Sequence, residues 1–292
     1  MSQGPSPGAG AARPGTNGPL VTDGPYELTG EMVTLLAPTS RRLVLNRRGS
    51  TVWQVTGDRG DHAVKLGYPA APTHQYTALA PAREATILRQ LGQDGVYWGE
   101  WARGTWSVQP WYDGKSVWDL WEPHRTGKER RNLETDALSC ARALAGLHAE
   151  GWVHGDVQPA HFLLGRHGTR LIDLGLARGG EVPAIYDFPH RGCLVHYESP
   201  EMSRSVLTTG TAVPTSASDV FGLGAGLFLS ATGLRAIDFP ADAERAEQRR
   251  VIARGRIRPV TIPGRLGKII EAMLSPGPAD RPSSADVCAA LG

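Results

Sequence analysis

Two aspartates near the middle of the chain lie in short turns that could perform chemistry together. Asp156 is part of the sequence His-Gly-Asp, and Asp173, 17 residues further on, is part of Asp-Leu-Gly. Each turn adjoins a short apolar run, 162–164 or 171–172, that suits one strand of a small hairpin. Phosphoryl transfer needs such a pair, because one carboxylate orients the attacking hydroxyl while the other holds a metal on the nucleotide phosphates. We therefore expect the two turns to converge on one site.

A lysine and a glutamate lie upstream in an order that suits the same chemistry. Lys65 falls in the alternating run HAVKLGY, which predicts a strand with Lys65 on one face and its apolar neighbours on the other. Glu84 follows 19 residues later, in a segment with helical spacing of apolar residues. Taken alone, the two would be an exposed strand lysine and an ordinary helix acid. Their position ahead of Asp156 and Asp173 favours an ion pair that positions phosphates.

Together these segments resemble those of the protein-kinase-like superfamily. HAVK is similar to the strand whose lysine binds nucleotide phosphates, His-Gly-Asp to the catalytic loop, and Asp-Leu-Gly to the metal-binding turn. Three later segments resemble the A-P-E element, the helix start that follows it and the arginine that pairs with its glutamate: HYESPE (196–201), SDVFGLG (218–224) and DRP (280–282). The resemblance covers about residues 43–291. It implies a bilobal fold with a nucleotide between the lobes and a buried Glu201–Arg281 ion pair.

The resemblance implies a role for each charged candidate. Asp156 is expected to orient the acceptor hydroxyl, and Lys65 and Glu84 are expected to position the phosphates. Asp173 is expected to hold the metal; the alternative for this residue is a cap on the turn before Gly175. The implied nucleotide is ATP or GTP, and the implied cation is Mg²⁺, with Mn²⁺ as the alternative.

The resemblance also implies which residues surround the adenine. In LNRRGSTVWQV, Val52 would lie over the base, although a single glycine replaces the glycine-rich loop that covers the phosphates in kinases. A plain β-turn with solvated arginines explains this stretch equally well. In VQPWYDGK, Gln109 would be the gatekeeper residue, and the backbone of Trp111 and Tyr112 would meet the adenine.

Three positions depart from the protein-kinase pattern. Gly155 replaces an arginine that reads a phosphorylated activation loop, so we do not expect that switch here. Gln158 replaces a lysine that contacts the γ-phosphate. His161 replaces an asparagine that binds a second metal ion; we weigh a metal ligand and a structural histidine equally, and an imidazole suits Mn²⁺ or Zn²⁺ better than Mg²⁺. The His-Gly-Asp form also resembles small-molecule kinases of the aminoglycoside and choline type.

These observations leave three functions open. The first is a divergent Ser/Thr kinase-like phosphotransferase that acts on a protein or peptide, in one version a precursor peptide, as in the kinases of lanthipeptide synthetases. The second is a pseudokinase, a nucleotide-binding scaffold that activates a partner enzyme; Gln158, His161 and the glycine-poor loop favour it. The third is a small-molecule kinase, which only His-Gly-Asp suggests. The presence of all four charged candidates favours the first.

The elements that must position these residues change in kind along the chain. Residues 1–25 are rich in Gly, Pro and Ala and predict a disordered leader. Short β-rich runs dominate 26–112, apart from a helix that begins near Pro81, and we expect MVTLLA (32–37) to be one of the strands. Helical spacing dominates 113–292. The sequence thus predicts an α+β molecule with a β-rich N-lobe, which binds the nucleotide, and a helical C-lobe with the catalytic and metal-binding loops.

Composition argues against several other classes of protein. The formal net charge is +2 and charged residues make up 21% of the chain, so we expect no nucleic acid and no membrane as partner. No apolar run approaches the roughly 20 residues that a spanning helix needs. The first residues lack the pattern of a secretory signal. Three scattered cysteines without metal-ligand spacing favour a cytoplasmic location.

Overall fold

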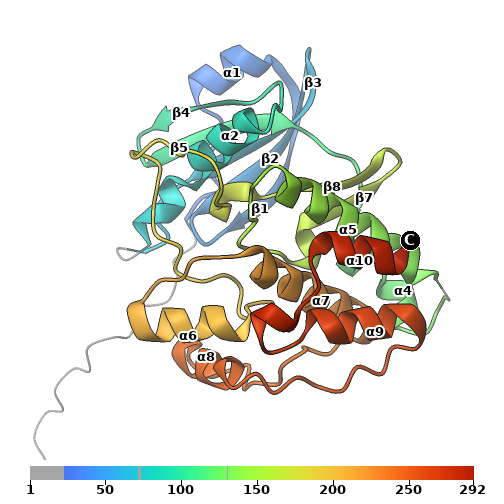
Figure 1. The fold of residues 1–292 in the computed structure, drawn as a ribbon. Helices are drawn as coiled ribbons and strands as arrows, with labels where there is room; N and C mark the ends of the chain where they lie inside the picture. Colours follow the sequence, from blue (N-terminus) through green and yellow to red (C-terminus); the bar gives the residue numbers. More distant parts are fainter. Residues whose placement is uncertain (1–22, 72–73, 130) are drawn as a thin grey trace, which may run out of the picture.

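The computed structural model describes residues 23–71, 74–129 and 131–292. The chain forms two lobes, an upper one built on a β-sheet and a lower helical one (Figure 1). The expected α+β, bilobal, kinase-like fold is therefore confirmed. Most of the leader expected at 1–25 lies outside the described residues. Its last part does not: Asp23 forms an ion pair with Arg103 of the upper lobe.

The upper lobe holds an antiparallel sheet of five strands in the order β1-β2-β3-β5-β4. The strands are β1 (Pro38–Arg47), β2 (Ser50–Gly57), β3 (Gly60–Gly67), β4 (Tyr97–Trp101) and β5 (Gly104–Pro110). The alternation predicted around Lys65 is present. Val64 and Leu66 are fully buried on one face of β3, and Lys65 lies on the other face.

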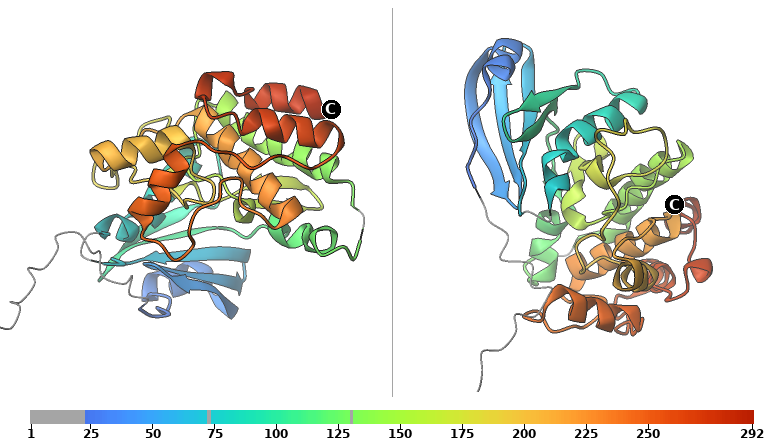
Figure 2. Two further views of the ribbon diagram at one scale, coloured as in Figure 1. Left: turned by 90° about the horizontal axis from the view of Figure 1, so that it is seen from below. Right: turned by 90° about the vertical axis from the view of Figure 1, so that its left-hand side faces the viewer.

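A short helix, α1 (Gly30–Leu36), covers the face of this sheet opposite Lys65 (Figure 2). Its buried Met32 and Leu36 join an apolar cluster with strand residues such as Val64. The strand predicted at 32–37 is therefore wrong. Thr29 starts the helix by accepting a hydrogen bond from the Met32 N–H. Met32 and Leu36 are spaced by one helical turn, but a short apolar run with this spacing also fits a strand.

Helix α2 (Ala80–Gln90) follows β3 and lies between the upper sheet and the lower lobe. It begins near Pro81, as predicted. Its apolar side packs into a cluster that includes residues of both lobes: Ala85, Ile87, Leu88, Val96, Leu147, Trp152, Leu174 and Ala177. Because Glu84 is on the same helix, this packing fixes its carboxylate at the junction of the lobes.

A small sheet at the same junction carries the two turns of interest. Its strands are β6 (Lys115–Ser116), β7 (Phe162–Gly165) and β8 (Gly168–Leu171). β7 and β8 form the expected hairpin, in which Phe162 pairs with Leu171. The chain enters β7 from the His-Gly-Asp turn and leaves β8 into the Asp-Leu-Gly turn, so both turns lie at the same end of the hairpin.

The lower lobe is helical. Its helices are α3 (Val117–Leu120), α4 (Glu122–Arg125), α5 (Leu133–Ala149), α6 (Pro200–Thr209), α7 (Ser216–Thr232), α8 (Arg245–Ala253), α9 (Gly264–Met273) and α10 (Ser284–Leu291). Helix α7 is the buried centre of this lobe, and its apolar residues share one core with α5, α9 and α10. We keep the lobe boundary after residue 112 as a proposal; it falls between β5 and β6. Among the described residues, every helix is too short or too polar to cross a bilayer.

The ion pair expected in the lower lobe is present. Nη1 and Nη2 of Arg281 donate to the two carboxylate oxygens of Glu201 at 2.7 and 2.8 Å. The Arg281 side chain is completely buried, and it also donates to the carbonyl oxygens of Ser275 and Ala217. The guanidinium thus joins α6 to the start of α7 and to the loop after α9.

This pair gives the first testable prediction. We expect Arg281→Met to lower the free energy of unfolding by about 3–5 kcal/mol, because Glu201 would keep a partly buried charge without a partner. Urea unfolding followed by circular dichroism measures the effect. In the control, Arg265→Met, an exposed ion pair with Glu134 is lost, and we expect at most about 1 kcal/mol. Equal losses in the two variants would contradict the assignment of a buried structural pair.

Candidate active site

Strand β3, helix α2 and the turn after β8 bring three charged residues together. Nζ of Lys65 lies 2.6 Å from Oε2 of Glu84 and 3.1 Å from Oδ1 of Asp173. Oε1 of Glu84 accepts a hydrogen bond from the Leu174 N–H at 3.2 Å. The side chains of Glu84 and Lys65 are 3% and 14% exposed, whereas that of Asp173 is 48% exposed. The lysine is therefore held from within the protein and faces an open carboxylate.

The surroundings of Lys65 and Asp173 keep both groups charged. Burial alone would lower the pKa of Lys65, but the charges of Asp173 and Glu84 outweigh it and raise that pKa. In turn the Lys65 ammonium holds the pKa of Asp173 well below its usual range, against the opposing effect of burial. Asp173 adopts a left-handed backbone with a φ of 65°, which Asp tolerates better than most residues. Asp173 is therefore an ionised carboxylate at neutral pH, at the mouth of the site.

The loop that carries Asp156 is fixed to helix α7 by one buried aspartate. Oδ2 of Asp219 accepts from the His154 N–H at 2.6 Å, and Oδ1 accepts from the Gly155 N–H at 2.9 Å. Nε2 of His154 donates to the Ile172 carbonyl at 3.0 Å, just before the Asp-Leu-Gly turn. His154 is completely buried beneath the loop. These bonds tie the two turns to each other and to α7.

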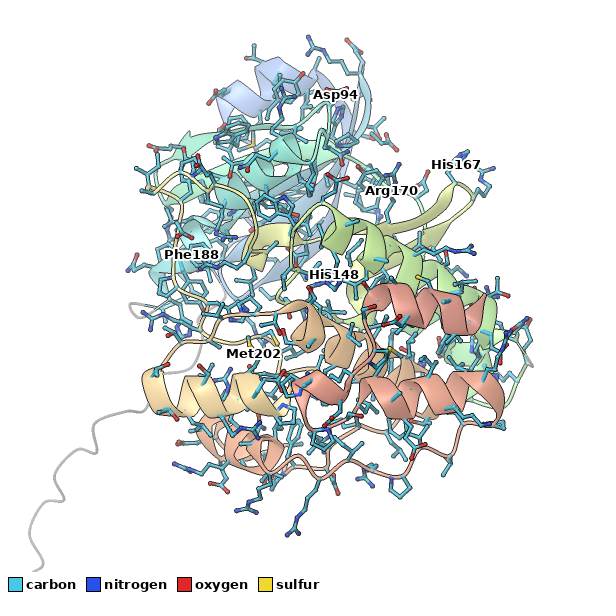
Figure 3. All side chains as sticks on the ribbon, viewed as in Figure 1. Asp94, His148, His167, Arg170, Phe188 and Met202 are labelled. Carbon is cyan, nitrogen blue, oxygen red and sulfur yellow. The ribbon has the colours of Figure 1, made fainter. Side chains whose placement is uncertain are left out.

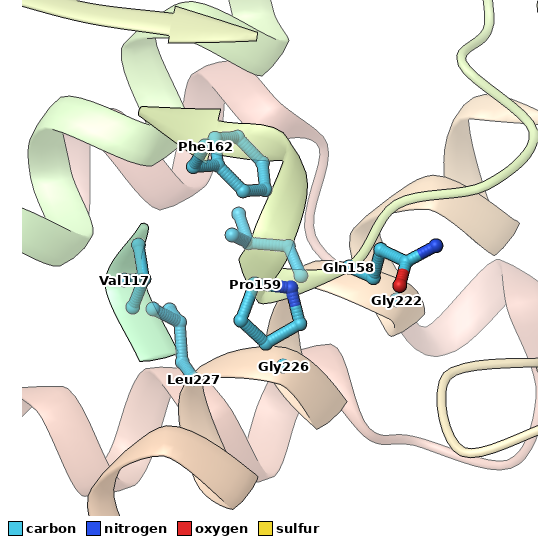
Figure 4. A pocket seen from close by; sticks show the side chains of 8 residues that line it. Val117, Gln158, Pro159, Phe162, Gly222, Gly226 and Leu227 are labelled. Carbon is cyan, nitrogen blue, oxygen red and sulfur yellow. The ribbon is translucent and has the colours of Figure 1, made fainter. Parts of the chain in front are cut away.

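Two glycines of α7 let the same loop approach the helix closely. A Cβ on Gly222 would lie 3.0 Å from Val157, and one on Gly226 would lie 3.1 Å from Pro159. Figure 4 shows Pro159 above Gly226, next to a small apolar cavity, with the Gln158 amide pointing away from that cavity. The packing therefore directs the polar end of Gln158 out of the core.

Asp156 has one oxygen that no protein group uses. Oδ2 accepts a hydrogen bond from Nε2 of Gln158 at 3.0 Å. Oδ1 is buried and has no hydrogen-bond partner among the described residues. A buried carboxylate oxygen without a donor costs free energy unless a ligand supplies one. The hydroxyl of a phosphate acceptor is a donor of this kind.

His161 connects the two aspartates. Its Nδ1 lies 2.9 Å from the Asp156 carbonyl oxygen, and its Nε2 lies 3.2 Å from Oδ2 of Asp173. Burial alone would lower the pKa of His161, but the hydrogen bond and charge of Asp173 outweigh it and raise that pKa. With both nitrogens protonated, the ring donates to both aspartates. This protonated form fits the structural role weighed for His161; to be a metal ligand the ring would have to lose the Nε2 proton, because a doubly protonated imidazole has no lone pair to give.

The donor set suits a cation that arrives with a nucleotide. Within the described part of the chain, no three His, Cys, Asp or Glu side chains are grouped closely enough to hold a metal by themselves. Mg²⁺ in proteins usually takes one or two carboxylates and completes its shell with phosphate oxygens and water. Asp173 and His161 supply two ligands of acceptable type, so the residues fit a metal shared with phosphates.

Two of the residues predicted to surround the adenine lie on the strands that flank β3. Val52 of β2 pairs with Lys65 across the sheet, and the buried Gln109 of β5 pairs with Ala63 of β3. The Trp111 N–H already donates to the Asp61 carbonyl at 2.9 Å. Among the described residues, the Tyr112 N–H has no acceptor. If a base binds here, the backbone donor would therefore come from Tyr112 and not from Trp111.

The stretch expected to cover the phosphates is a tight hairpin turn. Arg48 and Gly49 join β1 to β2 with φ values of 49° and 83°, which is the two-residue turn that a twisted hairpin favours. The Gly49 carbonyl accepts from the Tyr68 N–H at 2.9 Å. A Cβ on Gly49 would lie 2.5 Å from Oγ1 of Thr77. The stretch is thus a β-turn that packs against the segment before α2, and its expected position over the phosphates stays a prediction.

Gly155 cannot carry the arginine that it replaces. Its φ is 76°, and a Cβ would lie 2.9 Å from the Leu176 carbonyl oxygen. Its carbonyl accepts a hydrogen bond of 2.9 Å from Nε2 of His190. His190 lies in residues 176–195, between the Asp-Leu-Gly turn and HYESPE, which are here called the activation segment. Nδ1 of His190 accepts from the Gly192 N–H at 3.1 Å. A neutral histidine therefore holds the activation segment against the catalytic loop.

The sequence did not single out His190, nor the pair of Glu198 and Arg249. Oε1 and Oε2 of Glu198 accept from Arg249 at 2.7 and 2.9 Å, and the Cys193 N–H donates to Oε2. Glu198 lies within HYESPE, but the resemblance assigns a role only to Glu201 of that segment, and Arg249 lies on a different helix without a recognisable motif. The one sequence signal that could have pointed to them is the concentration of His and Glu residues in and around HYESPE.

His190 gives a prediction on pH dependence. Burial lowers the pKa of His190, despite the nearby Gly155 carbonyl and the carboxylates of Asp156 and Glu198. Its neutral form therefore stabilises the fold above the ordinary pKa of 6.5, and this contribution is lost as the pH falls. We expect the stability advantage of wild type over His190→Gln to shrink between pH 7.5 and pH 5, in urea unfolding. An advantage that grows on acidification would show that His190 is protonated in the folded state.

Comparison with known proteins agrees with this geometry. No family model matches the chain. The serine/threonine-protein kinase PknK of Mycobacterium tuberculosis is 33% identical over 190 residues, which cover 61% of this chain and 16% of PknK. PkaA of Streptomyces coelicolor, also a serine/threonine-protein kinase, is 34% identical over 155 residues, which cover 52% of this chain and 27% of PkaA. The chain thus spans between 16% and 27% of the length of these curated relatives.

The two-lobed fold and these similarities agree with the resemblance to the protein-kinase-like superfamily that the sequence indicated. The relatives carry the names of Ser/Thr protein kinases. The roles of the individual site residues and the lanthipeptide version of the function stay predictions.

Proposed function

We propose that this chain is a divergent Ser/Thr kinase-like phosphotransferase that moves the γ-phosphate of ATP or GTP to a hydroxyl of a protein or peptide. The observation that carries the proposal is the clustering of Lys65, Glu84 and Asp173 beside the unsatisfied oxygen of Asp156. One imidazole, that of His161, contacts both aspartates. The names of the relatives support the same reaction class.

The proposed mechanism assigns one task to each side chain. The Lys65 ammonium, held by Glu84, binds nucleotide phosphate oxygens. Oδ1 of Asp156 accepts the hydrogen bond of the acceptor hydroxyl and orients its oxygen towards the γ-phosphorus. As the new oxygen–phosphorus bond forms, the bond to the β-phosphate oxygen breaks, the nucleoside diphosphate leaves, and the hydroxyl proton passes to Asp156. Asp173, with His161, would hold a divalent cation, which supplies charge neutralisation on the phosphates.

Gln158 compensates in part for the lysine that it replaces. Its amide fixes the orientation of Asp156, but it brings no positive charge to the γ-phosphate. Because of this difference, we expect the transfer step to be slower here than in a site that has lysine at this position. The arginines of the β1–β2 turn could supply charge instead, since Arg47 and Arg48 are both exposed next to the site.

A second candidate is a nucleotide-binding scaffold that activates a partner enzyme. The observation in its favour is the β1–β2 turn, which is held against Tyr68 and Thr77 and does not form a glycine-rich cover over the phosphates. The bonds among Lys65, Glu84 and Asp173, together with the link from Asp173 through His161 to Asp156, favour transfer over this alternative. The cytoplasmic location and the absence of a nucleic-acid or membrane partner stay predictions.

The test is a transfer assay with three kinds of acceptor. The protein is incubated with γ-labelled ATP or GTP, with Mg²⁺ or Mn²⁺, and with Ser/Thr peptides, small alcohols or small amines. We expect label on peptide hydroxyls, dependent on Asp156. The matched control is Asp94→Asn, the same chemical change at a fully exposed residue of the upper lobe (Figure 3). Label only on small molecules would establish the small-molecule kinase. Nucleotide binding without transfer to any acceptor would favour the nucleotide-binding scaffold over a phosphotransferase.

A further inference from the structure

Three distant segments meet beside the acceptor site and bring arginines with them. The β1–β2 turn, with Arg48, packs on Thr77, as the 2.5 Å approach to a Cβ on Gly49 shows. The adjacent Tyr76 packs on Phe188 of the activation segment, with ring centroids 5.5 Å apart. Figure 3 shows Phe188 between the upper lobe and α6. Arg191 follows shortly after in the same segment.

Helix α8 adds two more arginines to this place. Nη2 of Arg249 lies 3.4 Å from the Arg191 carbonyl oxygen, and a Cβ on Gly192 would lie 2.2 Å from the same Nη2. Arg245 lies one helical turn before Arg249. The cluster of Arg48, Arg191, Arg245 and Arg249, here called the arginine cluster, therefore combines a turn, a loop and a helix.

The charges of the arginine cluster are not balanced within the protein. Arg249 is neutralised by Glu198, whose side chain is completely buried. The guanidinium groups of Arg48, Arg191 and Arg245 have no acidic partner among the described residues. Burial lowers the pKa of Arg245, and the charges of Arg48 and Arg249 lower it further, although Glu198 opposes them. Three exposed arginines near Arg249 thus carry charges that no acidic side chain of the described residues pairs with.

The cluster lies next to the place where an acceptor would react. Arg191 directly follows His190, whose ring donates to the Gly155 carbonyl, and Gly155 directly precedes Asp156. The other side of the cluster reaches Cys193, whose N–H donates to Glu198. A peptide that brings a hydroxyl to Oδ1 of Asp156 would therefore pass these guanidinium groups within a few residues of the reacting side chain.

We propose that the acceptor is a peptide segment with anionic side chains, carboxylates or phosphates, close to the reacting hydroxyl, and that Arg191 and Arg245 bind them with help from Arg48. Guanidinium groups suit this task because they form paired hydrogen bonds with carboxylates and phosphates. The inference rests on the proposed kinase function and names its substrate class.

The first experiment compares matched peptides with one serine. In each peptide the residues next to that serine, on one or both sides, are glutamate, glutamine, lysine or phosphoserine. The kcat/KM of each peptide is measured with labelled nucleotide. We expect the glutamate peptide to exceed the glutamine peptide about tenfold, a ratio that falls as salt is raised. The phosphoserine peptide distinguishes the two sources of negative charge: it exceeds the glutamate peptide if the arginines bind the doubly charged phosphate, and it falls below the glutamate peptide if the site accepts only a carboxylate.

The second experiment reverses the charge of the arginine cluster. In Arg191→Glu/Arg245→Glu, the preference should invert, so that the lysine peptide exceeds the glutamate peptide. The control is Arg254→Glu, the same change at an exposed arginine at the other end of α8. This control should keep the wild-type ratio.

The outcomes separate this inference from the proposed function. If wild type phosphorylates glutamate and glutamine peptides equally, the inference is wrong while the kinase function stands. If the charge-reversed variant keeps the wild-type preference, the anionic side chains bind elsewhere and the inference is also wrong. If no peptide is phosphorylated although nucleotide binds, the proposed function itself fails. Inversion of the peptide preference in the charge-reversed variant, and not in the control, supports both the inference and the proposed kinase function.

Discussion

Replacing Asp156 with asparagine is expected to slow phosphate transfer by about 10²–10⁴-fold, the range that a positioned acid or base contributes. The asparagine can keep the hydrogen bond from Gln158 through its carbonyl oxygen. Its amide nitrogen then occupies the place of Oδ1, where it cannot accept the hydroxyl proton. Nucleotide affinity should change little, because Asp156 does not contact Lys65 or Asp173 directly.

Initial rates at saturating nucleotide measure this effect, and a thermal melt of each variant checks that the fold is intact. Asp94→Asn should transfer phosphate at the wild-type rate. If Asp156→Asn retains more than about a tenth of the wild-type rate, Asp156 does not orient the acceptor, since even the weakest contribution of this kind exceeds that margin.

Replacing Lys65 with methionine is expected to have the second large effect, a loss of transfer of about 10²–10³-fold, the cost of removing one preorganised donor from a developing charge. A second consequence is loss of stability. Glu84 is almost fully buried and would keep a charge without its partner, which costs about 3–5 kcal/mol. Transfer rates and urea unfolding measure the two effects independently.

A double variant separates the two consequences. In Lys65→Met/Glu84→Gln the unpaired charge is gone, so most of the lost stability should return, while transfer should remain slow. If the double variant also regains activity, Lys65 acts only as the structural partner of Glu84. If neither single nor double variant loses activity, the phosphates lie elsewhere.

The fold could be predicted well where the pattern is periodic. The alternation around Lys65 located β3, and the helical spacing found over 113–292 agrees with the helices of the lower lobe. Helix α1 was missed because a short, mostly apolar run such as MVTLLA fits both a strand and a helix. The Thr29 cap and the burial of Met32 against the sheet decide this case, and burial is a tertiary property.

The site could be predicted where a motif carries it. The order of Lys65, Glu84, Asp156 and Asp173 was sufficient to expect one cluster, and the structure brings these residues together. The hydrogen bond from His190 to Gly155 could not be foreseen, because it joins two loops 35 residues apart without any periodicity. The same holds for Arg249 and Glu198, which are 51 residues apart.

The departures from the family pattern also required the structure. From the sequence, Gln158 and His161 are equally consistent with an impaired site and with a remodelled one. Both side chains form hydrogen bonds to Asp156, Gln158 to its carboxylate and His161 to its carbonyl. They therefore support the position of the proposed catalytic residue, which favours a remodelled site.

Calorimetric titration of the protein with nucleotide, with and without Mg²⁺ or Mn²⁺, tests the central claim most directly. That claim is that Lys65, Glu84 and Asp173 bind a nucleotide and its cation between the lobes. We expect one binding site that requires the cation and that Asp173→Asn weakens at least about tenfold, since the cation would lose its only carboxylate ligand. Cation-independent binding that is unchanged in Asp173→Asn, or no binding to the folded protein at millimolar nucleotide, would contradict it.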